Sequence, residues 1–94
     1  MSEPIPDVVT VWSKPGCQQC RMVKFRLEAV GVAFEERNLT ASEHARDLEY
    51  FRGIGYTSVP ITEYKALMVP GFTPSEIDQI IGSWRADHPA EVKA

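Results

Sequence analysis

Hydrophobic and polar positions near the start of the chain change from a strand pattern to a helical one. Val8 to Trp12 is almost continuously apolar and rich in β-branched residues, which is typical of a central strand covered on both faces. Pro15-Gly16 marks a turn, and apolar residues then recur at helical spacing from Met22 to Val30. Gly31 follows as a helix C-cap. The pattern predicts a strand, a turn and a helix.

The predicted helix has one apolar stripe, formed by Cys20, Val23, Leu27 and Val30. Met22 and Phe25 flank this stripe, and we expect them to be core or half-covered side chains. The segment 32–39 alternates at first and then becomes charged, which indicates a second strand with a solvated end. A strand, a helix and a strand in this order favour a parallel pair with a right-handed crossover.

A second helix is predicted to begin at Thr40, which forms a capping box with Glu43. Its charged residues indicate a solvated face, on which we expect His44 to be exposed rather than to act as a ligand. Gly53 to Tyr56 breaks this helix. The remaining chain predicts a strand over 61–64, which we expect to pair as an antiparallel hairpin with another over 67–69.

The last predicted helix opens with a second capping box, Thr73 and Glu76, with Pro74 at its first position. One face of this helix is apolar and carries Ile77, Ile80, Ile81 and Trp84. We therefore predict a single domain over residues 1–94, with a core of about 7–86 and a flexible tail over 87–94.

Composition excludes several classes of function. Of the 94 residues, 44% are hydrophobic and 24% are charged, which is typical of a globular domain. The net charge of −3 gives no basic surface for nucleic acid or for an anionic membrane. No signal-peptide pattern and no apolar run of membrane-spanning length are present. We expect a cytoplasmic monomer that binds neither nucleic acid nor membrane.

The chemistry is concentrated in a C-x-x-C motif, Cys17-Gln18-Gln19-Cys20, which holds both cysteines of the chain. At the start of a helix, unpaired N–H groups and the helix dipole stabilise a thiolate. We therefore predict that Cys17 is the nucleophile and that Cys20, one turn further along, resolves the mixed disulfide. Lys14 adds positive charge beside the thiolate, whereas Gln18 and Gln19 are neutral.

Two structural roles compete with redox chemistry for this pair. A static disulfide is disfavoured in a reducing compartment, and so short a loop constrains the unfolded chain little. A zinc site needs about four ligands, and only His44 and His88 are left to complete one. We therefore expect redox-active cysteines and no bound metal.

The order β-α-β-α-β-β-α resembles the thioredoxin fold in its short glutaredoxin-like form, an α/β fold with a four-stranded mixed sheet flanked by three helices. Within that superfamily the chain resembles the NrdH-redoxins, glutaredoxin-like electron donors. Three local matches carry the resemblance: Ser13 to Cys20 with Gln before the second cysteine, Gly55-Tyr56 before Val59-Pro60, and Gly71-Phe72 followed by Pro74.

The resemblance implies a partner-binding groove around the cysteines. Pro60 is expected to be cis, which would leave the Val59 backbone free to pair with an extended partner chain. Gly71 and Phe72 are expected to flank this groove, and Trp12, Gln18 and Gln19 are assigned to it as well.

The resemblance also implies the electron path. The protein would hold no cofactor, would receive electrons from NADPH through thioredoxin reductase, and would pass them to class Ib ribonucleotide reductase or another disulfide protein. It would thus be a protein-disulfide reductase of deoxyribonucleotide synthesis. The alternatives are a glutathione-dependent glutaredoxin, an iron-sulfur carrier and a non-catalytic peptide-binding module.

Two departures from related patterns bear on these alternatives. Glutaredoxins that use glutathione usually present Gly-Gly and then an acid where this chain has Gly71-Phe72-Thr73-Pro74. The absence of this Gly-Gly pair and acidic residue argues against a tight glutathione site. The NrdH-redoxins commonly have Trp-Ser-Gly-Phe-Arg-Pro there, and this chain has Val69 and Thr73 in place of the Trp and Arg.

Overall fold

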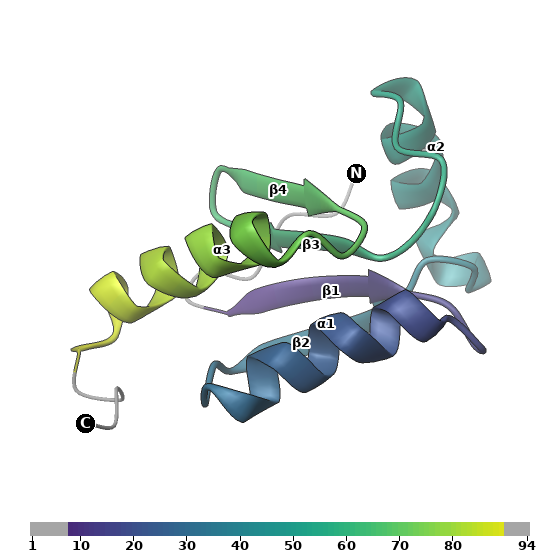
Figure 1. The fold of residues 1–94 in the computed structure, drawn as a ribbon. Helices are drawn as coiled ribbons and strands as arrows, with labels where there is room; N and C mark the ends of the chain where they lie inside the picture. The colour runs from purple at the N-terminus through teal and green to yellow at the C-terminus, as the bar shows by residue number, and fades with distance from the viewer. Residues whose placement is uncertain (1–7, 90–94) are drawn as a thin grey trace.

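A mixed four-stranded sheet forms the centre of the computed structural model, which describes residues 8–89 (Figure 1). The strands are β1 (Val9–Ser13), β2 (Phe34–Asn38), β3 (Ile61–Tyr64) and β4 (Leu67–Pro70), in the spatial order β2-β1-β3-β4. β1 runs parallel to β2, and β3 runs antiparallel to both β1 and β4. The expected mixed sheet is confirmed.

Three α-helices and one short 3-10 helix complete the fold: α1 (Gln18–Ala29), η1 (Ser42–His44), α2 (Ala45–Gly53) and α3 (Pro74–Asp87). α1 and α3 lie on the same face of the sheet, and α2 lies beyond one end of β1 (Figure 1). No helix within residues 8–89 combines the length and the apolar character needed to span a membrane.

The core consists of two clusters because β1 is covered on both faces. Val9 and Val11 belong to the larger cluster, which includes the buried side chains of α1 and α3: Val23, Leu27, Ile77, Ile80, Ile81 and Trp84. Trp12 belongs to the smaller cluster with Leu39, Phe51 and Ile61. The predicted apolar faces of the first and last helices are thus confirmed at these buried positions.

The predicted capping boxes do not form as side-chain caps. The Thr40 backbone N–H and hydroxyl instead both donate to the side-chain oxygen of Asn38, a local hydrogen-bonding pattern that competes with helix capping. The helical segment therefore starts later, at Ser42, with Ala41 as its cap residue. Thr73 is the cap residue of α3 and Pro74 its first residue, as expected, although no side-chain cap bond is present.

Three exposure predictions are wrong. Met22 and Phe25 are 40% and 73% exposed, because they lie on the side of α1 that no other described element covers. His44 is not exposed, since its side chain retains only 20% of its accessible surface. Its ring packs edge-on against Trp12, and its Nδ1 lies 3.1 Å from Asp47 Oδ2.

The C-terminal helix extends further than the sequence predicts. α3 includes Asp87, which accepts a hydrogen bond of 2.7 Å from the Tyr64 hydroxyl and pairs with Lys65 Nζ at 2.7 Å. These two bonds, the one from Lys65 first, lower the pKa of the Asp87 carboxyl. His88 stacks on Trp84. Regular structure thus includes Asp87, while the flexibility of the tail over 87–94 stays a prediction. Residues 90–94 of that tail lie outside the described chain, as does residue 7 of the predicted core.

Candidate active site

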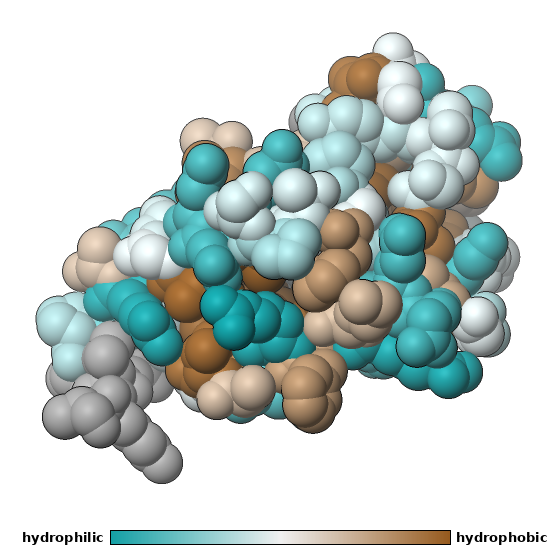
Figure 2. All heavy atoms as spheres, viewed as in Figure 1, coloured by the Kyte–Doolittle hydropathy of each residue, from teal (hydrophilic) through white to brown (hydrophobic). Residues whose placement is uncertain are grey.

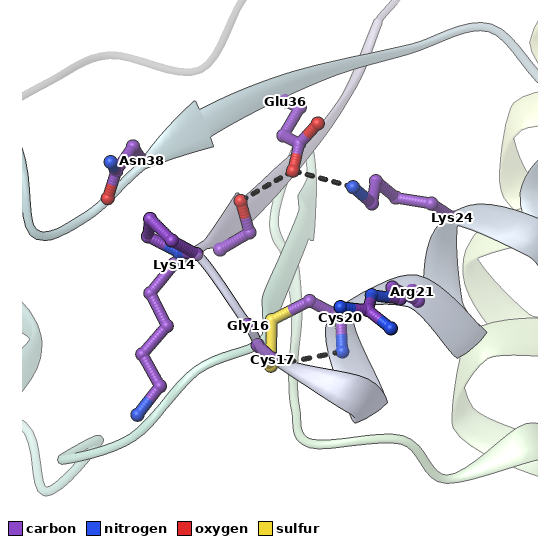
Figure 3. Close-up of a pocket in the computed structure, with 10 residues that line it drawn as sticks. Lys14, Gly16, Cys17, Cys20, Arg21, Lys24, Glu36 and Asn38 are labelled. Carbon is purple, nitrogen blue, oxygen red and sulfur yellow. Dashed lines mark hydrogen bonds and ion pairs between the residues drawn. A yellow bond between two sulfur atoms is a disulfide. The ribbon is translucent and has the colours of Figure 1, made fainter.

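Cys17 and Cys20 form a disulfide at the N-terminus of α1 (Figure 3). The chain leaves β1, turns at Gly16, where φ is +74°, and enters α1 with Cys17 as the N-cap residue. Glycine adopts this left-handed conformation without the steric cost that a Cβ would add. Cys17 Sγ accepts a hydrogen bond of 3.1 Å from the Cys20 backbone N–H. A sulfur atom therefore occupies the position of a helix-capping oxygen.

The two sulfur-bearing residues differ in accessibility. Cys17 is half-buried, whereas Cys20 is only 2% exposed because it lies on the inner stripe of α1. No acidic residue is present in the first turn of α1 to oppose a thiolate. A reduced Cys17 would thus combine access to a partner with stabilisation of its negative charge by the helix N-terminus.

A polar pocket of about 360 Å³ adjoins the disulfide on the side of β2. The Ser13 hydroxyl donates to Glu36 Oε2 at 2.7 Å, and Lys24 Nζ donates to the same oxygen at 2.8 Å (Figure 3). These bonds, the one from Lys24 first, lower the pKa of the Glu36 carboxyl. The pocket wall therefore holds an ion pair beside the two cysteines.

Sequence reasoning missed Ser13, Lys24 and Glu36 as neighbours of the site. One signal was available, because Lys24 is four residues after Cys20 and so shares its side of the helix. Lys14, which was predicted, also lines this pocket. Its side chain runs away from the disulfide in Figure 3, and its support of the thiolate stays a prediction.

The loops that were predicted to flank the groove do meet beside α1. The Val59–Pro60 peptide bond is cis, as expected. The Gly71 N–H donates to the Pro60 carbonyl at 2.8 Å, which joins the two loops. The Gln19 side chain lies beside Gly71, because a Cβ atom added to Gly71 would be 3.9 Å from Gln19 Oε1. Val59 is half-buried and Pro60 is buried.

Gln18 and Phe72 lie on a different side of the helix start. Both line a depression against the outer surface of α1, although Phe72 also packs against the larger core cluster. Phe72, expected to flank the groove, is therefore a half-buried side chain that contributes both to the larger core cluster and to the wall of this depression.

Trp12 does not line the groove, and this assignment is corrected. Its side chain is 2% exposed and packs against Phe51 in the smaller core cluster. Its Nε1 donates to Glu63 Oε1 at 2.8 Å. Burial raises the pKa of the Glu63 carboxyl, and the bond from Trp12 partly opposes this effect. The Trp12 indole points into the core rather than toward the groove, because alternate positions of β1 face opposite sides of the sheet.

Metal-binding side chains do not gather at this site. Among residues 8–89, no group of three or more His, Cys, Asp and Glu side chains has the arrangement needed to hold a metal ion.

The chain is similar to known proteins over most of its length. Residues 9–67 match the Glutaredoxin family. The chain is 34% identical over 73 residues to the glutaredoxin-like protein NrdH of Lactococcus lactis subsp. lactis, which covers 78% of this chain and 99% of that protein. It is 32% identical over 81 residues to the gene 56 protein of Mycobacterium phage L5, which covers 83% of this chain and 76% of that protein.

The fold is similar to that of a solved relative. NrdH-redoxin from Escherichia coli, a glutaredoxin-like protein described as having a thioredoxin-like activity profile, matches with a TM-score of 0.68 and 28% identity. The match covers 77% of this chain and 92% of that one. The predicted glutaredoxin-like form of the thioredoxin fold is confirmed.

Proposed function

This chain belongs to the glutaredoxin family, as one of its NrdH glutaredoxin-like members, and we propose that it reduces disulfide bonds in other proteins with its own cysteine pair. The observation that carries this proposal is the asymmetry of the pair. Cys17 is accessible at the helix N-cap, and Cys20 is shielded one turn further along. This arrangement suits the reaction, because the first thiol must meet the partner, whereas the second acts only within the mixed disulfide.

The reaction consists of two thiol–disulfide exchanges. The Cys17 thiolate attacks one sulfur of the partner's disulfide, whose other sulfur leaves as a thiolate and takes up a proton. Cys20 then loses its proton to solvent and attacks Cys17 Sγ in the mixed disulfide, which releases the second partner thiolate. The partner gains two electrons and two protons. The Cys17–Cys20 disulfide of the structure is the oxidised product.

We further propose that thioredoxin reductase, drawing on NADPH, restores the dithiol, and that the protein itself holds no cofactor. Two observations support this donor over glutathione. The E. coli relative is described as thioredoxin-like in activity, and the loop at Gly71 lacks the Gly-Gly and acidic residues of glutathione sites. The proposed acceptor is class Ib ribonucleotide reductase or another disulfide protein. The proposed setting is a cytoplasmic monomer in deoxyribonucleotide synthesis.

A coupled assay tests this proposal. NADPH oxidation with an oxidised disulfide protein as substrate is followed once with thioredoxin reductase and once with glutathione plus glutathione reductase. Turnover with thioredoxin reductase, lost in Cys17→Ser, is the expected result. Turnover only in the assay with glutathione and glutathione reductase would assign the chain to the glutathione-dependent glutaredoxins. No turnover with either donor would refute the oxidoreductase proposal.

A further inference from the structure

The outer side of α1 carries an apolar stripe that nothing in the described chain covers. Gln18, Met22 and Phe25 follow one another at spacings of four and three residues, so their side chains lie along one side of the helix. Met22 is 40% exposed and Phe25 is 73% exposed. Phe72 approaches from the loop before α3, and with Arg21 and Arg26 these residues line a depression of about 370 Å³, here called the α1 patch.

The α1 patch is continuous with the active site. Gln18 directly follows Cys17, and Phe72 directly follows Gly71, which lies beside Gln19. Figure 2 shows hydrophobic side chains gathered over α1 and the loop before α3, with hydrophilic side chains on both sides. A chain segment whose disulfide lies at Cys17 therefore has this apolar surface within reach of its neighbouring residues.

The charged residues around the α1 patch favour a partner of a particular charge. Arg21 lines both the α1 patch and the polar pocket beside the disulfide, and its guanidinium has no ion pair within residues 8–89. Lys14 and Lys24 line the same pocket, and Glu36 is the only acidic residue among the described residues that line it. The whole chain has a net charge of −3, so the surface beside the disulfide is cationic although the protein as a whole is acidic. Its complement is an acidic surface.

We propose that the α1 patch binds the disulfide-bearing segment of the redox partner through an apolar side chain, seated against Met22, Phe25 and Phe72, and a neighbouring carboxylate that pairs with Arg21. This inference rests on the proposed function of Cys17 and Cys20, and it names the substrate class: disulfides flanked by an apolar and an acidic residue. Apolar burial supplies most of the affinity, and the Arg21 pair supplies selectivity.

Single-turnover reduction of synthetic peptides tests the proposal without any electron donor. The protein is reduced with dithiothreitol, freed of it, and mixed with peptides that contain one intramolecular disulfide flanked by Leu and Glu, Leu and Gln, or Ser and Glu. Acid-quenched samples are separated to obtain second-order rate constants. The variants are Arg21→Gln and Phe25→Ser, with Arg46→Gln and Ile54→Ser as matched controls on exposed positions of α2 and its C-cap.

In the unsubstituted protein, we expect the peptide flanked by Leu and Glu to have the largest rate constant. It should exceed that of the Ser and Glu peptide by about tenfold and that of the Leu and Gln peptide by about two- to fivefold. Arg21→Gln should abolish the preference for Glu, and Phe25→Ser should reduce the preference for Leu. Salt at about 0.5 M should suppress only the preference for Glu. Both controls should retain both preferences.

Equal rates for the three peptides, or preferences that survive both α1 substitutions, would overturn the α1 patch as a docking surface. The neutral substrate hydroxyethyl disulfide separates this failure from failure of the proposed function. If the reduced protein reacts with that substrate but does not discriminate between the peptides, only the docking inference is wrong. If it reacts with no disulfide at all, the oxidoreductase proposal fails.

Discussion

The backbone N–H of Cys20 points at Cys17 Sγ across 3.1 Å, so the first sulfur of the motif caps its own helix. A thiolate accepts this bond more strongly than a thiol does, and the helix N-terminus adds to the effect. We predict that these two effects lower the pKa of the reduced Cys17 thiol below that of a free cysteine. The rate of alkylation against pH, measured on Cys20→Ser so that one thiol titrates, gives this value. A midpoint near that of a free cysteine would contradict it.

The difference in burial between the two cysteines predicts different outcomes for their substitution. Cys17→Ser should abolish disulfide reduction, because the remaining Cys20 is 2% exposed and does not meet a partner. Cys20→Ser should instead accumulate a mixed disulfide between Cys17 and the partner, visible as a species of summed mass on non-reducing separation. Release of reduced partner by Cys20→Ser at the normal rate would exclude Cys20 as the resolving thiol.

Glu63 should make stability depend on pH. Burial raises the pKa of its carboxyl, so the folded state binds the proton more tightly than the unfolded state does. Its stabilising contribution is therefore complete below the unfolded pKa and is lost as the pH rises through the folded pKa. Glu63→Gln removes the buried charge and keeps an oxygen for Trp12 Nε1.

Urea unfolding at neutral pH and at about pH 4 measures this effect. Relative to the unsubstituted protein, Glu63→Gln should be more stable at neutral pH, and this advantage should shrink in acid. An advantage that grows in acid would show that the charged carboxylate is favoured in the folded state.

The two sides of α1 should respond oppositely to truncation. Leu27 is fully buried against the sheet, and Leu27→Ala should lower the free energy of unfolding by about 2–5 kcal/mol. Phe25→Ala, two residues earlier on the exposed side, should change it by less than about 0.5 kcal/mol. Denaturant unfolding of both variants provides the comparison. A loss of similar size for Phe25→Ala would mean that its ring has a packing role in the folded domain.

The sequence predicted the layout of the sheet because β1 and the inner stripe of α1 carry strong periodic signals. β3 was predicted at Ile61–Tyr64, as observed, since clear breakers precede it. Gly31, expected as a cap, follows the last residues of α1 with φ of +74°. These features depend on local sequence alone.

The errors concern properties that only the assembled fold determines. Whether Phe25 is covered depends on which elements lie over the outer side of α1, and its apolar character says nothing about that. Trp12 was placed in the groove because it is close to the cysteines in sequence. The pleat of β1 instead directs it to the opposite face, toward Glu63. The Glu36 and Lys24 pair joins two elements, β2 and α1, whose contact no short motif encodes.

The hydrogen bond from Gly71 to Pro60 fixes the relative position of the two loops beside the cysteines before any partner arrives. The conformational entropy of ordering these loops is therefore lost during folding rather than during each encounter, which leaves more of the contact energy for affinity. In the proposed reaction, each partner leaves after one exchange. A rim whose two loops are already joined by this bond suits such a reaction, because it does not have to close around a partner and reopen.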